Sequence, residues 1–139
     1  MKDSDLKRRT KRFALEIIKF VESLPRDETC RVIGRQLVRA GTSVGANYRA
    51  ANRAKSPPDF LSKKGTVEEE ADENGYWLEL LVDAGKTTTT KVAPLLTEAG
   101  ELVAIAVSSI NTARATARHS NPSDRKNSAF RAPRSAFAP

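Results

Sequence analysis

The chain has 139 residues, of which 39% are hydrophobic and 29% charged, and its formal net charge at pH 7 is +7. This length suits one domain with a sizeable hydrophobic core. Residues 1–12 are crowded with charge and no apolar run follows them, so we expect no secretory signal. No run approaches the roughly 18 apolar residues of a membrane span, and we expect no membrane partner. The one cysteine, Cys30, cannot form an internal disulfide, which favours the reducing cytoplasm.

Apolar residues at three- and four-residue spacing predict a first helix over about 5–24, which Pro25 ends. A second helix is expected over about 27–54, with Asp27 as its N-cap. One face of it is apolar and includes Cys30. A different face carries an arginine stripe, made of Arg31, Arg35, Arg39, Arg49 and Arg53. Three glycines beside the apolar face predict a closely packed neighbouring helix, since each costs about 1 kcal/mol inside a helix: Gly34, Gly41 and Gly45.

A third helix is expected over about 59–84, with Asp59 as N-cap and Gly85 just past its end. A fourth is expected over about 90–118. Four amphipathic helices with short connectors predict an all-α fold, an antiparallel up-down-up-down four-helix bundle, for residues 1–119. Residues 120–139 are rich in Pro, Ser, Ala, Phe and cations, and we expect a disordered basic tail there.

Two strings resemble functional motifs, but both stand in the wrong context. Gly41-Thr-Ser-Val-Gly45 matches a nucleophile elbow, which needs a strand before its serine, whereas Ser43 lies within a helical pattern. Gly85-Lys86-Thr87 resembles the end of a phosphate-binding loop, but Leu80 stands where that motif requires glycine. One His and one Cys cannot build a Cys/His zinc site, and the acids of residues 68–73 lie on one helix. We therefore predict no enzymatic activity, no cofactor and no metal.

Charge is distributed unevenly along the chain. Residues 26–55 carry seven Lys/Arg and two acids, whereas residues 59–85 carry two Lys and eight acids. The two segments should therefore face each other, within one chain or between chains. Glu70 and Glu73 share a face of the third helix with Trp77. For Arg35 and Arg39 we favour pairing with these acids, from the neighbouring helix or from another subunit, over contact with phosphates.

The other cations and aromatics leave alternatives open. Phosphate contact and plain solubility are both expected roles for a further set of cations: Arg49, Arg53, Lys55, Arg8, Arg9 and Arg12. Tyr76 and Trp77 could stack on bases, although aromatics beside a core stripe more often pack. A subunit interface fits both Trp77 and Tyr48.

The string Leu37-Val-Arg-Ala-Gly-Thr-Ser-Val-Gly-Ala-Asn-Tyr-Arg49, with Glu70-Ala-Asp-Glu73 and Tyr76-Trp-Leu-Glu-Leu-Leu81, resembles the 23S rRNA intervening-sequence protein family. The likeness covers about residues 6–118. It implies a four-helix bundle that assembles as a ring-like homopentamer. It also implies a distant relation to the accessory protein of diversity-generating retroelements, a basic pentamer that works with a reverse transcriptase and nucleic acid.

Nine residues match the signature of this family: Arg39, Thr42, Ser43, Gly45, Asn47, Glu70, Glu73, Tyr76 and Trp77. Two residues depart from it. Ala50 stands where the resemblance leads us to expect a Glu, and Gly75 stands where it leads us to expect a larger residue.

We therefore predict a cytoplasmic, non-enzymatic homopentamer that associates with RNA or DNA, of which RNA is favoured, through its basic surfaces. Fivefold repetition would turn a weak patch into a useful binding surface through avidity. The alternative is a protein-interaction scaffold without a nucleic-acid ligand. In this scaffold the arginine and acidic stripes are used in contacts within the oligomer, and the tail recruits a protein partner. A toxin–antitoxin or phage-defence accessory is a third interpretation.

Overall fold

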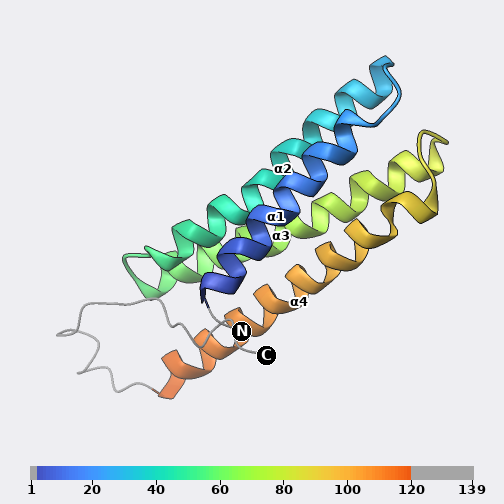
Figure 1. Ribbon diagram of the computed structural model, residues 1–139. Coiled ribbons are helices and arrows are strands. Elements are labelled where there is room, and N and C mark those ends of the chain that lie inside the picture. The colour runs from blue at the N-terminus through green and yellow to red at the C-terminus, as the bar shows by residue number, and fades with distance from the viewer. Residues whose placement is uncertain (1–2, 120–139) are drawn as a thin grey trace.

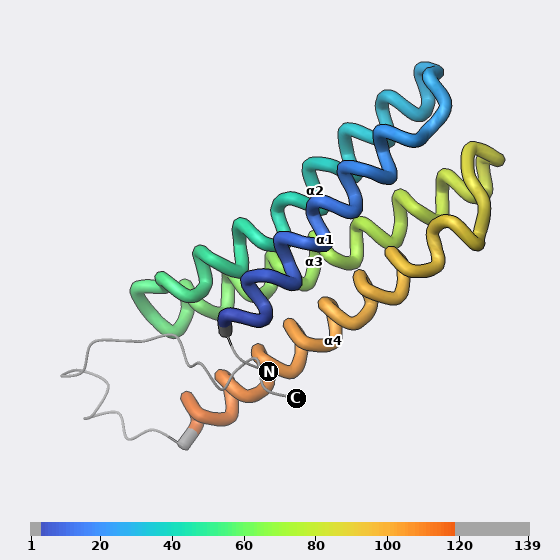
Figure 2. Tube along the Cα trace, in the orientation of Figure 1, coloured from blue at the N-terminus to red at the C-terminus, as the bar shows by residue number. Residues whose placement is uncertain are grey.

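The computed structural model describes residues 3–119, which form four helices joined by short turns. The helices are α1 Asp3–Glu22, α2 Glu28–Asn52, α3 Pro57–Asp83 and α4 Thr89–His119. Consecutive helices run in opposite directions along one bundle axis (Figures 1 and 2), and the part of the chain that is described contains no strand. The predicted all-α up-down bundle is confirmed. The expected tail, residues 120–139, lies outside the described residues.

Local capping explains where α2 and α3 begin. The predicted N-cap Asp27 is confirmed, because its carboxylate accepts a 2.8 Å hydrogen bond from the backbone of the first turn of α2. The start of α3 differs from the prediction. Ser56 is the N-cap, and its hydroxyl accepts a 3.1 Å bond from the backbone N–H of Asp59. Pro57 and Pro58 occupy the first turn, where their missing N–H groups leave no helical bond unmade.

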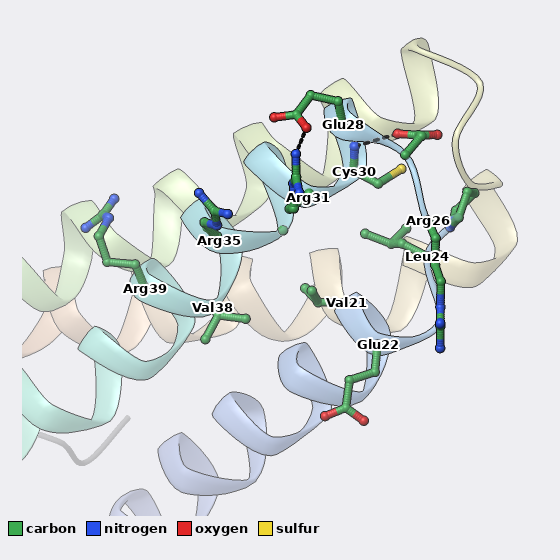
Figure 3. A pocket seen from close by; sticks show the side chains of 13 residues that line it. Val21, Glu22, Leu24, Arg26, Glu28, Cys30, Arg31, Arg35, Val38 and Arg39 are labelled. Carbon is green, nitrogen blue, oxygen red and sulfur yellow. Dashed lines mark hydrogen bonds and ion pairs between the residues drawn. The ribbon is translucent and has the colours of Figure 1, made fainter.

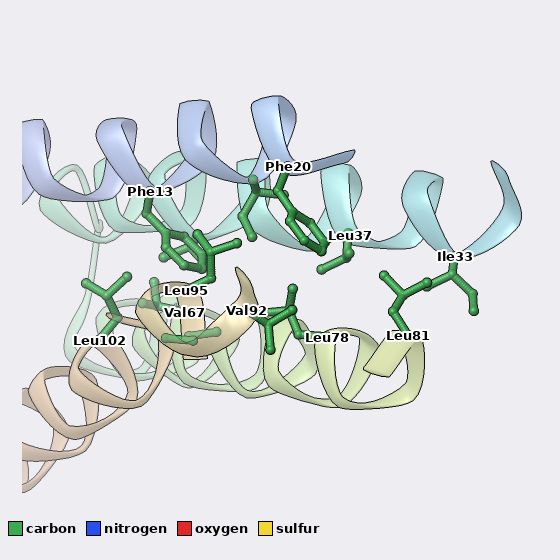
Figure 4. Close-up of a cluster of buried hydrophobic side chains, with 14 of the residues drawn as sticks. Phe13, Phe20, Ile33, Leu37, Val67, Leu78, Leu81, Val92, Leu95 and Leu102 are labelled. Atoms are coloured by element: carbon green, nitrogen blue, oxygen red, sulfur yellow. The ribbon is translucent and has the colours of Figure 1, made fainter. Parts of the chain in front are cut away.

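The main core runs along the bundle axis and receives side chains from all four helices (Figure 4). Phe13 of α1, Leu37 of α2 and Leu78 of α3 have no exposed surface, and Leu102 of α4 is 3% exposed. Cys30 is also buried, as its place in the apolar stripe predicts, and this burial raises the pKa of its thiol. The cysteine is therefore a packing residue.

Helix α1 packs closely on α2 at three glycines, Gly34, Gly41 and Gly45. A Cβ added at Gly34 would lie 2.8 Å from Val21, and one added at Gly41 would lie 3.0 Å from Ile17. Both distances are shorter than ordinary van der Waals contact. The close approach that the glycines predict is confirmed, and the neighbour is α1.

Of the described helices, α4 is long and apolar enough over Thr89–Arg118 to cross a membrane, judged by length and composition alone. The mean hydropathy of its most apolar window is 1.4, and 33% of that window is buried. A core helix of a soluble bundle meets the same criteria. Val92 and Ala106 of this helix are buried in the bundle, and its Glu98 bonds to Arg9 of α1.

Candidate nucleic-acid interface

Cations from all four helices gather toward one end of the bundle. At this end α1 and α3 begin while α2 and α4 end (Figure 1). The exposed or half-exposed cations contributed by these helix ends include Arg8, Lys11, Arg12, Arg49, Arg53, Lys55, Lys63, Arg114 and Arg118. The up-down connectivity therefore converts cations that are far apart in the sequence into one basic surface, which we call the basic end.

A groove of about 680 Å³ at the α2–α3 turn is the most concentrated part of the basic end. Four cations and one acid line it: Arg49, Arg53, Lys55, Lys63 and Asp59. No ion pair joins these cations to another described residue. The one acid is engaged locally, since its carboxylate accepts a 3.1 Å bond from the backbone N–H of Lys55. Three of the predicted nucleic-acid residues thus lie together, and we call this site the basic groove.

Ala50 also lines the basic groove. This is the position where the family resemblance leads us to expect a Glu. A carboxylate there would stand one residue from Arg49 and would offset one of the four positive charges. With alanine at this position the positive potential of the groove is stronger than it would be with a carboxylate there.

The three predicted N-terminal arginines have different surroundings. Arg9 donates to Glu98 of α4 through Nε at 2.8 Å and Nη2 at 2.5 Å, and also contacts Glu101. The Glu98 hydrogen bond raises the pKa of Arg9. Arg9 therefore joins α1 to α4. Among the described residues Arg12 pairs only with Glu16, one turn away on its own helix, and it remains largely exposed, as does Arg8.

A second charged cluster joins α2 to α3 around Arg39. Its guanidinium bonds to Glu73 at 2.6 Å and to both carboxylate oxygens of Glu70 at 3.3 Å. Trp77 donates from its indole N–H to the same Glu73 oxygen at 3.2 Å. The expected pairing therefore forms at Arg39. Within the chain it does not form at Arg35, which is exposed and makes no ion pair with a described residue.

The pKa values of the two carboxyl groups in this cluster are shifted in opposite directions. Burial raises the pKa of Glu70, and the neighbouring Glu73 reinforces that effect against the opposing charge of Arg39. Burial also acts to raise the pKa of Glu73, but hydrogen bonds from Arg39 and Trp77 outweigh it and hold that pKa below its ordinary value. As the pH falls, Glu73 therefore stays ionised to a lower pH than Glu70 does.

The short polar signature residues are satisfied by their own helix. Thr42 and Ser43 donate to backbone carbonyls one turn earlier at 2.7 Å, and Asn47 does so at 2.9 Å. Because Ser43 lies inside α2, the strand-to-helix turn of a nucleophile elbow is not formed there. Among residues 3–119, no three His, Cys, Asp or Glu side chains are grouped so that they could hold a metal ion.

Tyr48 requires a correction. We expected it at a subunit interface, but it is 1% exposed and lies in the core of its own bundle. Tyr48 lies four residues after Val44 and three before Ala51, so the apolar periodicity of this helix already predicted its burial. Lys64 of α3 is fully buried beside it, with its Nζ 4.8 Å from the Tyr48 ring centroid and 5.5 Å from that of Phe60.

Sequence reasoning missed two lysines of α3. Lys63 lines the basic groove and adds to the set that we predicted there. Lys64 was missed because a lysine gives no apolar signal, although it falls on the same face as Phe60 and Val67. Charge counting treats the two neighbours alike, but the helix turns by about 100° between them.

Comparison with known proteins gives the following matches. Residues 2–108 match the model of the family described as 23S rRNA-intervening sequence protein. A crystal structure of a protein with unknown function from the S23 ribosomal protein family of Bacteroides thetaiotaomicron is 33% identical, with a TM-score of 0.74. The match covers 80% of this chain and 99% of that chain. No curated protein is significantly similar in sequence.

Proposed function

The chain belongs to the 23S rRNA-intervening sequence protein family, and from that premise we propose that it is a non-enzymatic, cytoplasmic homo-oligomer, a pentamer, that associates with nucleic acid. We favour RNA over DNA as this nucleic acid, because the family description names an rRNA intervening sequence. The contact surface is the basic end of the bundle, with the basic groove at its centre.

The observation that carries this proposal is the composition of the basic groove. Arg49, Arg53, Lys55 and Lys63 line it with one acid, and none of the four is taken up by an ion pair with a described residue. Two other arginines differ from these four, since Arg9 and Arg39 are both held by carboxylates of neighbouring helices. This difference supports the basic groove as the contact surface. Unpaired cations grouped at one site are what phosphate contact requires.

This geometry favours phosphate contact over base reading. Apart from its cations and one acid, the groove is lined by alanines, so no aromatic side chain is offered for stacking and no amide for base edges. Binding should therefore be weakly sequence-specific and strongly dependent on salt. Repetition of the groove around a homo-oligomer would strengthen a weak single contact, because the second contact forms at high effective concentration.

The test is a fluorescence titration of the full chain against structured RNA, single-stranded RNA and duplex DNA at several salt concentrations. For single strands the logarithm of the binding constant should fall with the logarithm of salt, with a slope of about 0.7 per phosphate contacted. The variant Arg49→Ala/Arg53→Ala should weaken binding and reduce that slope by about 1.4. Ala50→Glu should weaken binding without removing any cation.

A matched control is Lys19→Ala/Lys91→Ala. Both lysines are exposed, and both lie toward the opposite end of the bundle, near the end of α1 and the start of α4. This double variant loses the same net charge as the arginine variant. Equal weakening by the two variants would mean that net charge, and not the basic groove, is responsible.

An intact oligomer that binds none of the three nucleic acids would overturn the proposal in favour of a protein-interaction scaffold. Large apolar side chains on the surface suit that rival, since Leu15 is 53% exposed and Val32 is 48% exposed. Truncation at Ser120 then discriminates further. A scaffold whose tail recruits a partner would lose that partner and keep its oligomeric state.

A further inference from the structure

The outward face of the C-terminal half of α3 is acidic. Four exposed acids lie on it, and with Tyr76 they follow three- and four-residue spacing: Glu69, Asp72, Glu79 and Asp83. None of the four forms an ion pair with another residue in the described range 3–119. Tyr76 lies in the middle of this face, is 57% exposed, and packs edge-on against Trp77 with ring centroids 5.0 Å apart. We call this surface the acidic face.

The outward face of α2 carries the opposite charge. Arg31, Arg35 and Arg39 follow one another at four-residue spacing and form a row along the helix (Figure 3). Val32, beside this row, is 48% exposed. Arg31 has only the neighbouring Glu28 as a partner, and Arg35 has none among the described residues. We call this surface the arginine row.

The arginine row cannot reach the acidic face of its own chain. Arg39 does contact α3, but the carboxylates that it meets are Glu70 and Glu73 on the flank of α3 beside α2. At about 100° per residue, the centre of the acidic face lies about 110° around α3 from the midpoint of Glu70 and Glu73. Both faces therefore remain open toward a second molecule.

The two faces match in dimension and in chemistry. The arginine row runs over nine residues and the acidic face over fifteen, so at a rise of about 1.5 Å per residue they are about 12 Å and about 21 Å long. The row thus fits within the length of the acidic face. Each face adds an exposed apolar side chain, Val32 or Tyr76, which an interface would cover. Complementary rows of charge also set the register and orientation of such a contact.

We infer that copies of this chain join through the arginine row of one and the acidic face of the next. This inference rests on the homo-oligomer of the proposed function and names its contact surfaces. Since the two surfaces are different parts of one chain, the contact is head-to-tail, which builds a ring when its rotation closes. It also leaves the basic groove, at the far end of α2, free for nucleic acid.

Charge reversal tests the inference by light scattering. Arg31→Glu/Arg35→Glu places acids on both faces, and Asp72→Arg/Glu79→Arg places two arginines on the α3 face, where Glu69 and Asp83 remain. Each variant should fall from the mass of the assembly to the 15.2 kDa of the single chain. In the chain with all four substitutions the new glutamates of one copy can pair with the new arginines of the next, so it should recover the wild-type mass. Lys19→Glu, an exposed reversal on α1, should leave the mass unchanged.

The outcomes separate this inference from the function on which it rests. A wild-type chain that is itself 15.2 kDa would overturn the homo-oligomer and leave both faces to other partners. A wild-type assembly that both reversals leave intact would overturn only the choice of faces. A fourfold variant that is folded by circular dichroism but stays monomeric would do the same. Arg35→Gln and Glu79→Gln repeat the test with smaller perturbation, and both should weaken assembly.

Discussion

The ammonium group of Lys64 lies 4.8 Å from the centroid of the Tyr48 ring, and both side chains are buried between α2 and α3. A cation over an aromatic face gains up to about 2 kcal/mol when the pair is desolvated, but burial of the charge opposes that gain. The volume of the side chain is therefore expected to matter more than its charge.

Lys64→Met keeps most of this volume and removes the charge, and it should change the free energy of unfolding by less than about 1.5 kcal/mol. Lys64→Ala removes the packing as well and should destabilise the bundle by about 2 kcal/mol or more. Urea denaturation of both variants measures the difference. A Met variant as unstable as the Ala variant would show that the charge itself holds this part of the core.

Replacing glycine by alanine should change the stability of the bundle in opposite directions at Gly41 and at Gly100. At Gly41 an added Cβ would lie within 3.0–3.2 Å of three atoms of Ile17, whereas at Gly100 it would meet nothing within 4 Å. Both positions are inside helices, where alanine is better than glycine by about 1 kcal/mol. Gly100→Ala should therefore raise the thermal midpoint. Gly41→Ala should lower it, because overpacking typically costs about 1–3 kcal/mol; an increase at Gly41 would mean that α1 moves away readily.

The contact between Arg9 and Glu98 should measurably couple α1 to α4. The two side chains are 22% and 23% exposed, and two hydrogen bonds join them. A double-mutant cycle with Arg9→Gln and Glu98→Gln should give a coupling free energy of about 1 kcal/mol, at the upper end for partly exposed pairs. The same cycle on Arg12 and Glu16, an exposed pair within α1, should give about 0.5 kcal/mol or less.

The cap of α2 should make stability depend on pH. The backbone N–H of Cys30 and the ammonium of Lys86 both bond to Asp27 and lower its pKa below the ordinary 3.8. The folded chain thus binds this proton less tightly than the unfolded chain does, so the stabilisation is complete above that value and is lost as the pH falls below it. Asn is an equally good N-cap that does not titrate.

The measurement is urea unfolding of the wild type and of Asp27→Asn at several pH values. The stability advantage of the wild type should shrink as the pH falls below about 4. A difference that stays constant from neutral to acidic pH would mean that the carboxylate is held no better in the folded chain than in the unfolded one.

The helices themselves could be predicted from the sequence because their signals are local. Apolar spacing and the caps near Asp27 and Gly85 placed the helix ends within about two residues of those observed. The start of α3 differs in one detail, since its N-cap is Ser56 and not the predicted Asp59. The glycines of α2 predicted a close neighbour, although they did not say that the neighbour would be α1.

The candidate site depended on the tertiary structure, because it joins residues that no local pattern relates. Arg9 and Glu98 are far apart in the sequence, and only the antiparallel packing of the bundle brings them into contact. Arg49 and Lys63 meet in one groove for the same reason, and Arg114 reaches the same end of the bundle through α4. Lys63 and its neighbour Lys64 show this most clearly, since the first lines the basic groove and the second is buried. Periodicity places the two on different faces of α3, but the packing of α2 against α3 decides which face is buried and which is offered to a ligand.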